Sequence, residues 1–460
     1  MNLLILQPIA DLSAHRTAYR HEVAMLGAAL RQAGHAVTLL LVGPPDEAAL
    51  AAALAGTHAG LVLLYVEALA ADIAFRSAGT AASVLGAPVI PFGPHARLCP
   101  DECLSLRGAE AVAVAPADLA VPPYLESRAS SPDSARTPGF WIKCETGVMR
   151  NPLPRPPEKL DLPLPARDLY PWNELLDSAG LASIEVARGG EVLRPTAPDA
   201  APLPNAGAAW PVLHRPVASV IGEMLLVADE QLDLGGWRVG NERWTAQPEW
   251  LAEFAPRYAR EVALPLRTVL HAPDVTDEVA AGLARAGCEE VVLPVGSASA
   301  FIRHDILDLH VPTEAYETAF AALRRADVPS VARVEVGTPY ETAITLDETA
   351  ALLRRLDPDR VEAVLHFPAP GTRSYKAAKE NGWLVPDPAA AHLAGRPALA
   401  LRNLSAEDVW QACEFLPYLI HQPPIVPLLR WSRGVKLGRY GTLYDRLVKP
   451  FLAPPQRKPK

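Results

Sequence analysis

Histidine and tyrosine side chains follow two apolar runs that we expect to form strands near the start of the chain. His15 and Tyr19 come after the run 3–7, and a short turn follows the run 89–92. The residues of that turn are Gly93, Pro94, His95 and Ala96. Ligands of sheets built from alternating strands and helices bind beyond the carboxyl ends of the strands. We therefore expect these residues to line a site for a small ligand, with a turn histidine bonded to backbone as the alternative for His95.

No familiar catalytic motif accompanies these residues. The sequence has no Gly-x-Gly-x-x-Gly after its first strand, no Walker loop, no Gly-x-Ser-x-Gly elbow and no His-Glu-x-x-His. Each of these motifs places a phosphate, a nucleophile or a zinc ion by a fixed local geometry. A dinucleotide site is therefore not expected, and the sequence predicts no metal site.

These residues are positioned by a series of short apolar runs, which we expect to be strands, that alternate with segments of helical periodicity. The expected strands are 3–7, 36–42, 60–65, 89–92 and 111–115, and the expected helices are 22–33, 46–54 and 70–85. This order predicts an α/β fold that begins with a doubly wound, flavodoxin-like (Rossmann) parallel sheet over residues 1–121. Residues 122–180 are rich in proline and predict a linker.

The alternation resumes at about residue 181. The expected strands are 183–187, 224–228, 267–270, 290–295, 331–336 and 363–367, and the expected helices are 250–258, 277–285, 314–325 and 346–356. Six such units suit a partial TIM-type (β/α)6 barrel over residues 181–385, with its site on the loops after the strands. Residues 386–460 predict a small helical C-terminal region that ends in a basic tail.

Composition limits the classes of function. The 460 residues carry a net charge of -9, which gives no electrostatic reason to expect nucleic acid as a partner. Five scattered cysteines do not suit a disulfide framework, which predicts a cytoplasmic protein. No signal peptide or transmembrane segment is expected, because the apolar runs are short. The basic tail 430–460 is expected to be a solvated helix face, with contact to an anionic membrane surface or a partner as the alternative.

Several strings, in the same order along the chain, resemble the cobalamin (B12)-binding radical SAM superfamily. The turn 93–96 with Pro-Asp-Glu at 100–102 is similar to the Gly-Gly-Pro-His-Ala and Pro-Glu-Glu of its cobalamin-binding domains. The string 162–169 resembles the Leu-Pro-x-Pro-x-Arg-Asp that precedes the family's barrel. Gly-Thr-Pro-Tyr-Glu-Thr at 337–342 and Pro-Ala-Pro-Gly-Thr at 368–372 are similar to strings within and at the end of that barrel. The resemblance implies a cobalamin site in the first domain, and a [4Fe–4S] cluster with SAM in the barrel.

The sequence departs from this family at the cluster motif. In the family, the first barrel strand is followed by Arg-Gly-Cys-x-x-x-Cys-x-x-Cys, whose three thiolates bind the cluster. Here the corresponding positions are Gly190, Arg194 and Ala197. None offers a thiolate, and arginine is a permanent cation that does not ligate iron. The motif is therefore degenerate, and neither the cluster nor SAM is expected to bind in the family's way.

The resemblance also assigns roles to other residues. It places His95 nearest the corrinoid, and it places Glu341, within the string 337–342, among candidates for the barrel site. Asp229 and Glu230 follow the expected strand 224–228, where the family has acidic residues lining the site, although they are equally an ordinary loop pair. The Asp-x-His-x-x-Gly string that supplies a histidine to cobalt is absent, as it is in many radical SAM relatives.

Three functions follow from the resemblance and its departure. The first is a pseudoenzyme that binds a corrinoid or another small ligand and acts as an accessory or regulator beside a cluster-bearing radical SAM partner. The second is an active enzyme with an unconventional site, such as a B12- and SAM-dependent methyltransferase. The third is a purely structural partner.

Overall fold

The computed structural model describes residues 1–10, 18–43, 47–130, 134–190, 210–231, 233–436 and 442–452. The chain divides into two compact units: residues 1–240 with 369–372, and residues 241–368 with 373–460. This division does not coincide with the boundaries expected near 121, 181 and 386, which stay predictions.

The first unit begins with a parallel sheet of four strands in the order β2-β1-β3-β4. The strands are β1 (Asn2–Pro8), β2 (Ala36–Val42), β3 (Leu61–Tyr65) and β4 (Val89–Phe92). The helices are α1 (His21–Gln32), α2 (Glu47–Ala55), α3 (Ala71–Leu85), α4 (Pro94–Leu98), α5 (Pro100–Leu104) and α6 (Ala117–Ser130). The order agrees with a flavodoxin-like start.

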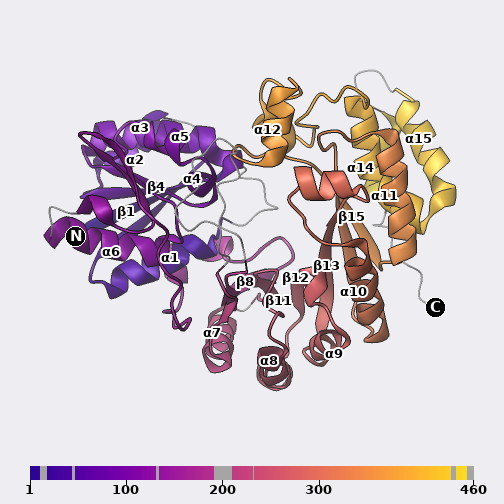
Figure 1. Cartoon of the computed structure of the whole chain (residues 1–460), viewed down its shortest axis with the longest axis horizontal. Helices are drawn as coiled ribbons and strands as arrows, with labels where there is room; N and C mark the ends of the chain where they lie inside the picture. The colour runs from indigo at the N-terminus through magenta and orange to yellow at the C-terminus, as the bar shows by residue number, and fades with distance from the viewer. Residues whose placement is uncertain are drawn as a thin grey trace. The chain divides into compact units, whose positions relative to one another are not determined.

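Alternation along the strands explains the layers of this sheet. Leu3 and Ile5 of β1 pack with α1 and α6 on one face, whereas Leu4 and Leu6 pack with α2 and α3 on the other. Figure 1 shows these helix pairs on opposite sides of the sheet. Because successive side chains of a strand point to opposite faces, a continuous apolar run is buried on both sides.

Two sequence expectations about the end of this region need correction. The strand expected at 111–115 does not extend the parallel sheet. It forms β5 (Ala111–Ala113), which pairs antiparallel with β6 (Phe140–Cys144), and β6 pairs with β7 (Gly147–Arg150). The stretch 122–180 is also more than a proline-rich connection, because it contains most of α6 and the hairpin β6–β7.

The first unit continues with a strand–helix–strand repeat. The elements are β8 (Leu181–Glu185), α7 (Val217–Glu230) and β11 (Gly236–Gly240), and β8 and β11 are parallel. The strand expected at 224–228 is wrong, because these residues lie within α7, and the strand β11 was missed. A short apolar run does not distinguish a buried strand from a helix by periodicity alone.

The second unit contains a parallel run of four strands in the order β15-β14-β13-β12. The strands are β12 (Leu266–Val269), β13 (Cys288–Gly296), β14 (Ser330–Val336) and β15 (Arg360–Leu365). The helices are α8 (Pro248–Glu261), α9 (Asp277–Arg285), α10 (Thr313–Arg325), α11 (Ala343–Leu356), α12 (Arg373–Glu380), α13 (Pro388–Leu393), α14 (Ala406–His421) and α15 (Val426–Gly434). The expected alternation of strands and helices is confirmed here.

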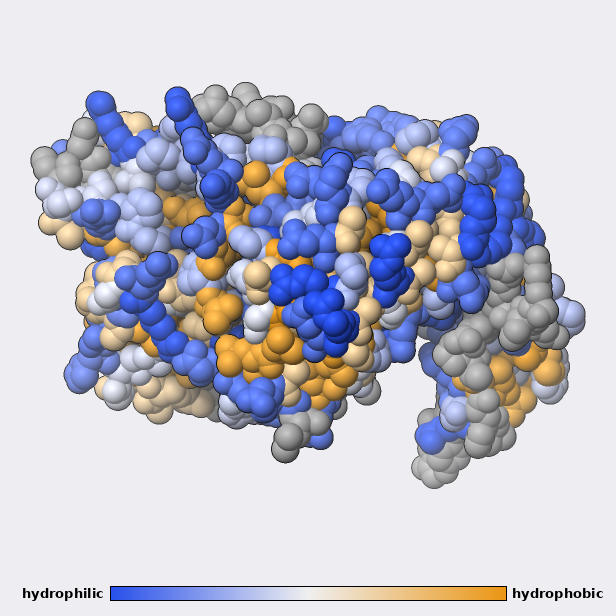
Figure 2. All heavy atoms as spheres, turned by 90° about the horizontal axis from the view of Figure 1, so that it is seen from below, coloured by the Kyte–Doolittle hydropathy of each residue, from blue (hydrophilic) through white to orange (hydrophobic). Residues whose placement is uncertain are grey.

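The described part of the basic tail is folded back on the helices of the second unit. Arg433 lies 3.2 Å from Glu407 and 2.6 Å from Asp445, and its guanidinium stacks over Trp410. Among the described residues, no helix has the length and apolarity needed to cross a bilayer. On the face drawn in Figure 2, hydrophobic patches are bounded by hydrophilic side chains.

Candidate functional site

The carboxyl end of β8, where the resemblance places the cluster, carries a buried group of charges. Arg188 follows the strand and lies 2.6 Å from the carboxylate of Asp118 and 2.9 Å from that of Glu185. His21, at the start of α1, lies 3.3 Å from the same Glu185 carboxylate. One arginine thus pairs with two carboxylates from separate parts of the first unit.

A second ionic group lies beside the first. Glu223 of α7 is 2.9 Å from Arg167 and 2.7 Å from Arg215, and all three side chains are buried. Arg167 also donates to the backbone carbonyl of Ser183 in β8, at 2.6 Å, and stacks over the Tyr19 ring. Arg215 donates to the backbone carbonyl of Glu185, which connects the two groups. We call these seven residues the β8 ion network: Asp118, Arg167, Glu185, Arg188, Arg215, Glu223 and His21.

The network favours the ionised form of two of its carboxylates, Glu185 and Glu223. Burial by itself raises the pKa of Glu185, but Arg188 and His21 outweigh burial and lower it to about 2. Burial likewise opposes ionisation of Glu223, and Arg167 and Arg215 reverse that effect, so its pKa is lowered. Three arginines balance three carboxylates, which is the condition under which buried charges are tolerated.

The backbone after β8 turns through two glycines. Ala187–Arg188 (β9) pairs antiparallel with Leu213–His214 (β10), and the Gly190 N–H donates to the Trp210 carbonyl at 2.8 Å. Gly189 has φ of 92°, and a β-carbon there would lie 2.1 Å from the Pro211 carbonyl oxygen. The returning chain therefore closes tightly against position 189.

Gly190→Cys, which restores the first ligand of the family motif, is expected to lower the free energy of unfolding by about 1–2 kcal/mol. The reason is that Gly190 has φ of 77°, a left-handed conformation that is costly for a residue with a β-carbon. Gly56→Cys is the control, because φ there lies outside the left-handed region and nothing lies within 4 Å of an added β-carbon. Urea unfolding measures both, and equal effects would contradict the prediction.

The described residues around β8 do not fit a [4Fe–4S] cluster. Gly190 has no side chain, and Arg194 and Ala197 lie outside the described residues. All five cysteines are free, and within the described ranges only one group of three potential metal ligands converges, formed by His95, Cys99 and Glu102. Since a cluster of this class needs cysteine thiolates, no step of a reaction is routed through one here.

The turn after β4 holds His95 inside the first unit. Gly93 has φ of 103°, and a β-carbon there would lie 2.9 Å from the Tyr65 ring. The backbone N–H of His95 donates to the Val66 carbonyl, and its Nε2 lies 3.0 Å from a Glu102 carboxylate oxygen. Pro94 is exposed and Ala96 is buried. His95 is thus bonded to a backbone carbonyl through its backbone N–H and to a carboxylate through its ring.

The remaining residues expected in the first-unit site are not brought to one place. Tyr19 is buried, and its hydroxyl lies 3.2 Å from His21 Nδ1, within the β8 ion network. His15 lies outside the described residues. Asp229 and Glu230 are exposed at the end of α7, so they do not follow a strand.

Glu341 lies in the second unit, in the turn that follows β14. It is buried, and its carboxylate accepts the Gly337 N–H. Burial raises the pKa of Glu341 to about 8, against the backbone hydrogen bonds that lower it. The carboxyl group is therefore protonated through most of the neutral range.

Sequence reasoning missed a histidine–carboxylate pair near Glu341. His366 follows β15, is buried, and places Nδ1 2.5 Å from the Glu335 carboxylate of β14. Its Nε2 is buried without a hydrogen-bond partner among the described residues. The available signal was the position of His366 directly after a strand, where sites of such sheets form.

Cys99 and Cys103, the two cysteines beside His95, are not activated as nucleophiles. Burial, and then Glu102, raise the pKa of Cys99 to about 12. Burial also leads the causes that raise the pKa of Cys103, again with Glu102 second. Both thiols are therefore protonated at neutral pH, and only a thiolate is an effective nucleophile.

The chain was compared with known proteins. No family model and no curated protein sequence matches it. Among solved structures, the radical S-adenosylmethionine methyltransferase TsrM from Kitasatospora setae has a TM-score of 0.61 at 18% identity, over 82% of this chain and 76% of that one. The cobalamin-dependent S-adenosylmethionine radical enzyme OxsB has a TM-score of 0.62 at 12% identity, over 83% of this chain and 56% of that one.

These likenesses establish the fold. The chain has the fold seen in the cobalamin-dependent radical SAM enzymes TsrM and OxsB, as the short strings led us to expect. The two structures are described as TsrM with tryptophan and a SAM analogue bound, and as OxsB with aqua-cobalamin bound. At identities of 18% and 12%, the structural likeness shows the fold but not which reaction or ligand this chain has.

Proposed function

We propose that this protein is a degenerate relative of the cobalamin-dependent radical SAM enzymes that binds a corrinoid or a related small ligand. It acts as an accessory or regulator beside a cluster-bearing partner and performs no 5'-deoxyadenosyl radical chemistry. The observation that carries this proposal is the β8 ion network. Where the resemblance places the cluster ligands, the chain has a glycine, and next to it Arg188 is paired with Glu185 and Asp118.

The fold supports the corrinoid part of the proposal, because structures of this fold have been determined with cobalamin bound. The turn 93–96 at the carboxyl end of β4 is the segment of this chain proposed to contact it. His95 Nε2 is hydrogen-bonded to Glu102, and the Asp-x-His-x-x-Gly string that supplies a histidine to cobalt is absent from the sequence. We therefore propose that the corrinoid is held without a protein histidine. A bound corrinoid would supply a cobalt centre, and this chain's residues would orient it.

Metal analysis tests the proposal. The protein is expressed anaerobically with hydroxocobalamin and iron supplied, and cobalt, iron, sulfide and the visible spectrum are measured on one sample. Near-stoichiometric cobalt without iron is the expected result. Iron with sulfide and the broad absorption of a thiolate-held cluster would overturn the loss of radical chemistry, and absence of cobalt would overturn the corrinoid.

An enzymatic alternative, corrinoid-dependent methyl transfer, is favoured by one observation. The pair of His366 and Glu335 leaves an imidazole nitrogen buried without a described partner, an arrangement suited to accepting a proton. Transfer of labelled methyl from SAM, lost in His366→Gln and retained in His310→Gln, would establish this alternative. His310 is an exposed histidine of the same unit.

A further inference from the structure

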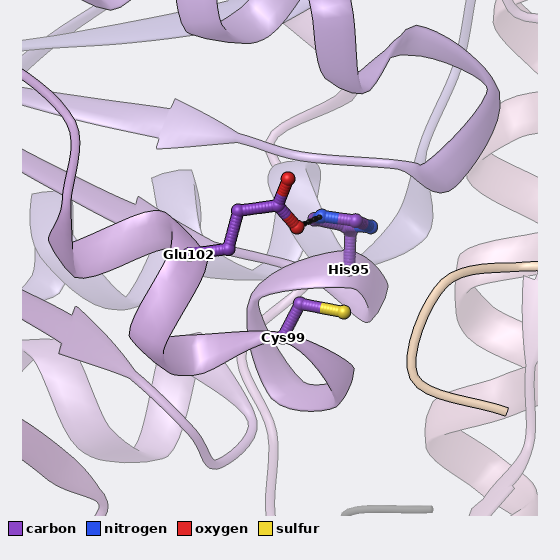
Figure 3. A group of neighbouring side chains, drawn as sticks. All are labelled: His95, Cys99 and Glu102. Atoms are coloured by element: carbon purple, nitrogen blue, oxygen red, sulfur yellow. Dashed lines mark hydrogen bonds and ion pairs between the residues drawn. The ribbon is translucent and has the colours of Figure 1, made fainter. Parts of the chain in front are cut away.

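Three potential metal ligands converge in the first unit outside the β8 ion network. His95 lies on α4, Cys99 joins α4 to α5, and Glu102 lies on α5, so their spacing is i, i+4 and i+7. One ligand atom from each lies within 4.8 Å of the other two. Figure 3 shows the three side chains gathered around the same space, with Glu102 hydrogen-bonded to the imidazole. Side chains from one short helical segment thus present a nitrogen, a sulfur and an oxygen together.

The protein contacts of His95 leave its ring incompletely satisfied. Its side chain is 1% exposed, and Nδ1 is buried with no hydrogen-bond partner among the described residues. The ring packs edge-on against Phe75, with centroids 5.8 Å apart, which holds the imidazole in place. A buried polar atom without a partner is uncommon in folded proteins, and it is typical of a place where an ion or a water molecule binds. A metal ion bound here would therefore be ligated by an imidazole whose orientation is already fixed by packing.

The cluster is closed on one side and open on the other. The segment 369–372 belongs to the same compact unit, and a β-carbon on Gly371 would lie 3.1 Å from Cys99 Sγ and 2.8 Å from the Leu98 carbonyl oxygen. The Glu102 side chain is 49% exposed. Gly371 therefore packs close to Cys99, and the exposed Glu102 side chain gives solvent ions access to the cluster.

We propose that His95, Cys99 and Glu102 form a binding site for a divalent transition-metal ion, with Zn²⁺ as the best match. A neutral imidazole, a thiolate and a carboxylate together carry two negative charges, equal in size to the charge of the ion. Zinc accepts all three donor types, and three protein ligands with an open fourth position describe its non-structural sites. On binding, the Cys99 thiol releases its proton to solvent, and a ring nitrogen of His95 and a carboxylate oxygen of Glu102 each donate a lone pair to the metal.

This site goes beyond the proposed function and does not depend on it. Zinc binding is measured on protein produced without cobalamin, so a corrinoid contributes nothing to the result. Failure of zinc binding leaves the corrinoid experiment unaffected, and failure of corrinoid binding leaves the zinc site unaffected.

The test is a zinc titration of the full-length protein after its metals have been removed with a chelator. Competition with a coloured chelator gives the affinity, and elemental analysis gives the stoichiometry. We expect one zinc ion per chain, and we expect Cys99→Ser and Glu102→Gln each to weaken binding by at least about 100-fold. That magnitude follows because even the hydrogen-bond partners of metal ligands contribute ~10–100-fold.

Matched variants separate ligation from general effects on folding. Cys144→Ser changes a half-buried cysteine of β6, and Asp101→Asn changes the exposed carboxylate next to Glu102. Both are expected to bind zinc as the unchanged protein does. Glu102→Gln replaces a half-exposed side chain that keeps a carbonyl for the histidine bond, so it is expected to fold. Thermal unfolding without zinc checks this.

A spectroscopic readout makes the role of the thiolate specific. Cobalt(II) added in place of zinc should give a sulfur-to-metal charge-transfer band in the unchanged protein and none in Cys99→Ser. Zinc should also raise the midpoint of thermal unfolding, because a ligand that binds only the folded state stabilises it. Equal zinc affinity in the unchanged protein, Cys99→Ser and Glu102→Gln, or no binding by the unchanged protein, would overturn the proposal.

Discussion

Glu223→Gln is expected to lower the free energy of unfolding by about 3–5 kcal/mol, which is the usual cost of removing one partner from a buried ion pair. Glu223 is 2% exposed and compensates two buried arginines, Arg167 and Arg215. The glutamine keeps the shape and one acceptor oxygen but removes the charge. Two guanidinium groups would then remain inside the first unit with their positive charges uncompensated by this side chain.

The matched control lies on the same helix. Glu230, at the end of α7, is exposed, and Glu230→Gln is expected to change stability by less than about 0.5 kcal/mol. Urea unfolding followed by circular dichroism measures both variants. The double variant Glu223→Gln with Arg167→Met should recover part of the loss, because it removes one of the uncompensated charges. Similar small effects of Glu223→Gln and Glu230→Gln would show that the network contributes nothing to stability.

The second large effect concerns the pH dependence that Glu341 imposes on the second unit. Its pKa in the folded protein is about 8, against an ordinary value of 4.5, because the carboxyl group is buried. Glu341 therefore stays protonated in the folded protein over a range of pH in which it is already ionised in the unfolded chain. Stability contributed by the protonated group is full below pH 4.5 and is lost as the pH rises through 8. The loss amounts to up to about 5 kcal/mol.

Glu341→Gln should remove this dependence, since a glutamine accepts the Gly337 N–H but does not ionise. Urea unfolding at pH 5 and pH 9 is expected to show a fall in stability for the unchanged protein and a much smaller fall for the variant. Glu348→Gln, an exposed position on α11, should behave as the unchanged protein does. A Glu341→Gln variant with the full pH dependence would contradict the raised pKa.

The surroundings of position 190 are unfavourable for a cysteine in two ways. A cysteine there would be two residues from Arg188, which is already paired with Asp118 and Glu185. Position 190 in addition has a backbone conformation that disfavours any side chain.

Local pattern was a good guide where a short run rich in apolar residues stood between helical patterns. The runs 3–7, 36–42 and 89–92 are strands β1, β2 and β4, and the four strands of the second unit were likewise predicted. The pattern failed for 224–228, where an apolar run belongs to a helix whose Leu225 and Leu226 are exposed. A run of five apolar residues satisfies either element, and only the packing of the neighbouring strands decides between them.

The amino-acid sequence was sufficient for the alternation of strands and helices, the expectation of a fold like that of cobalamin-dependent radical SAM enzymes, and the absence of thiolates at 190, 194 and 197. These features depend on residue type and local spacing. The hydrogen bonds from Arg188 to Asp118, from Arg167 to Glu223, and between His366 and Glu335 join residues 31 to 70 positions apart. The interaction in such a pair depends on the distance between the two groups and on their burial. Both are set by the tertiary structure, so the pairs could not be predicted from the sequence.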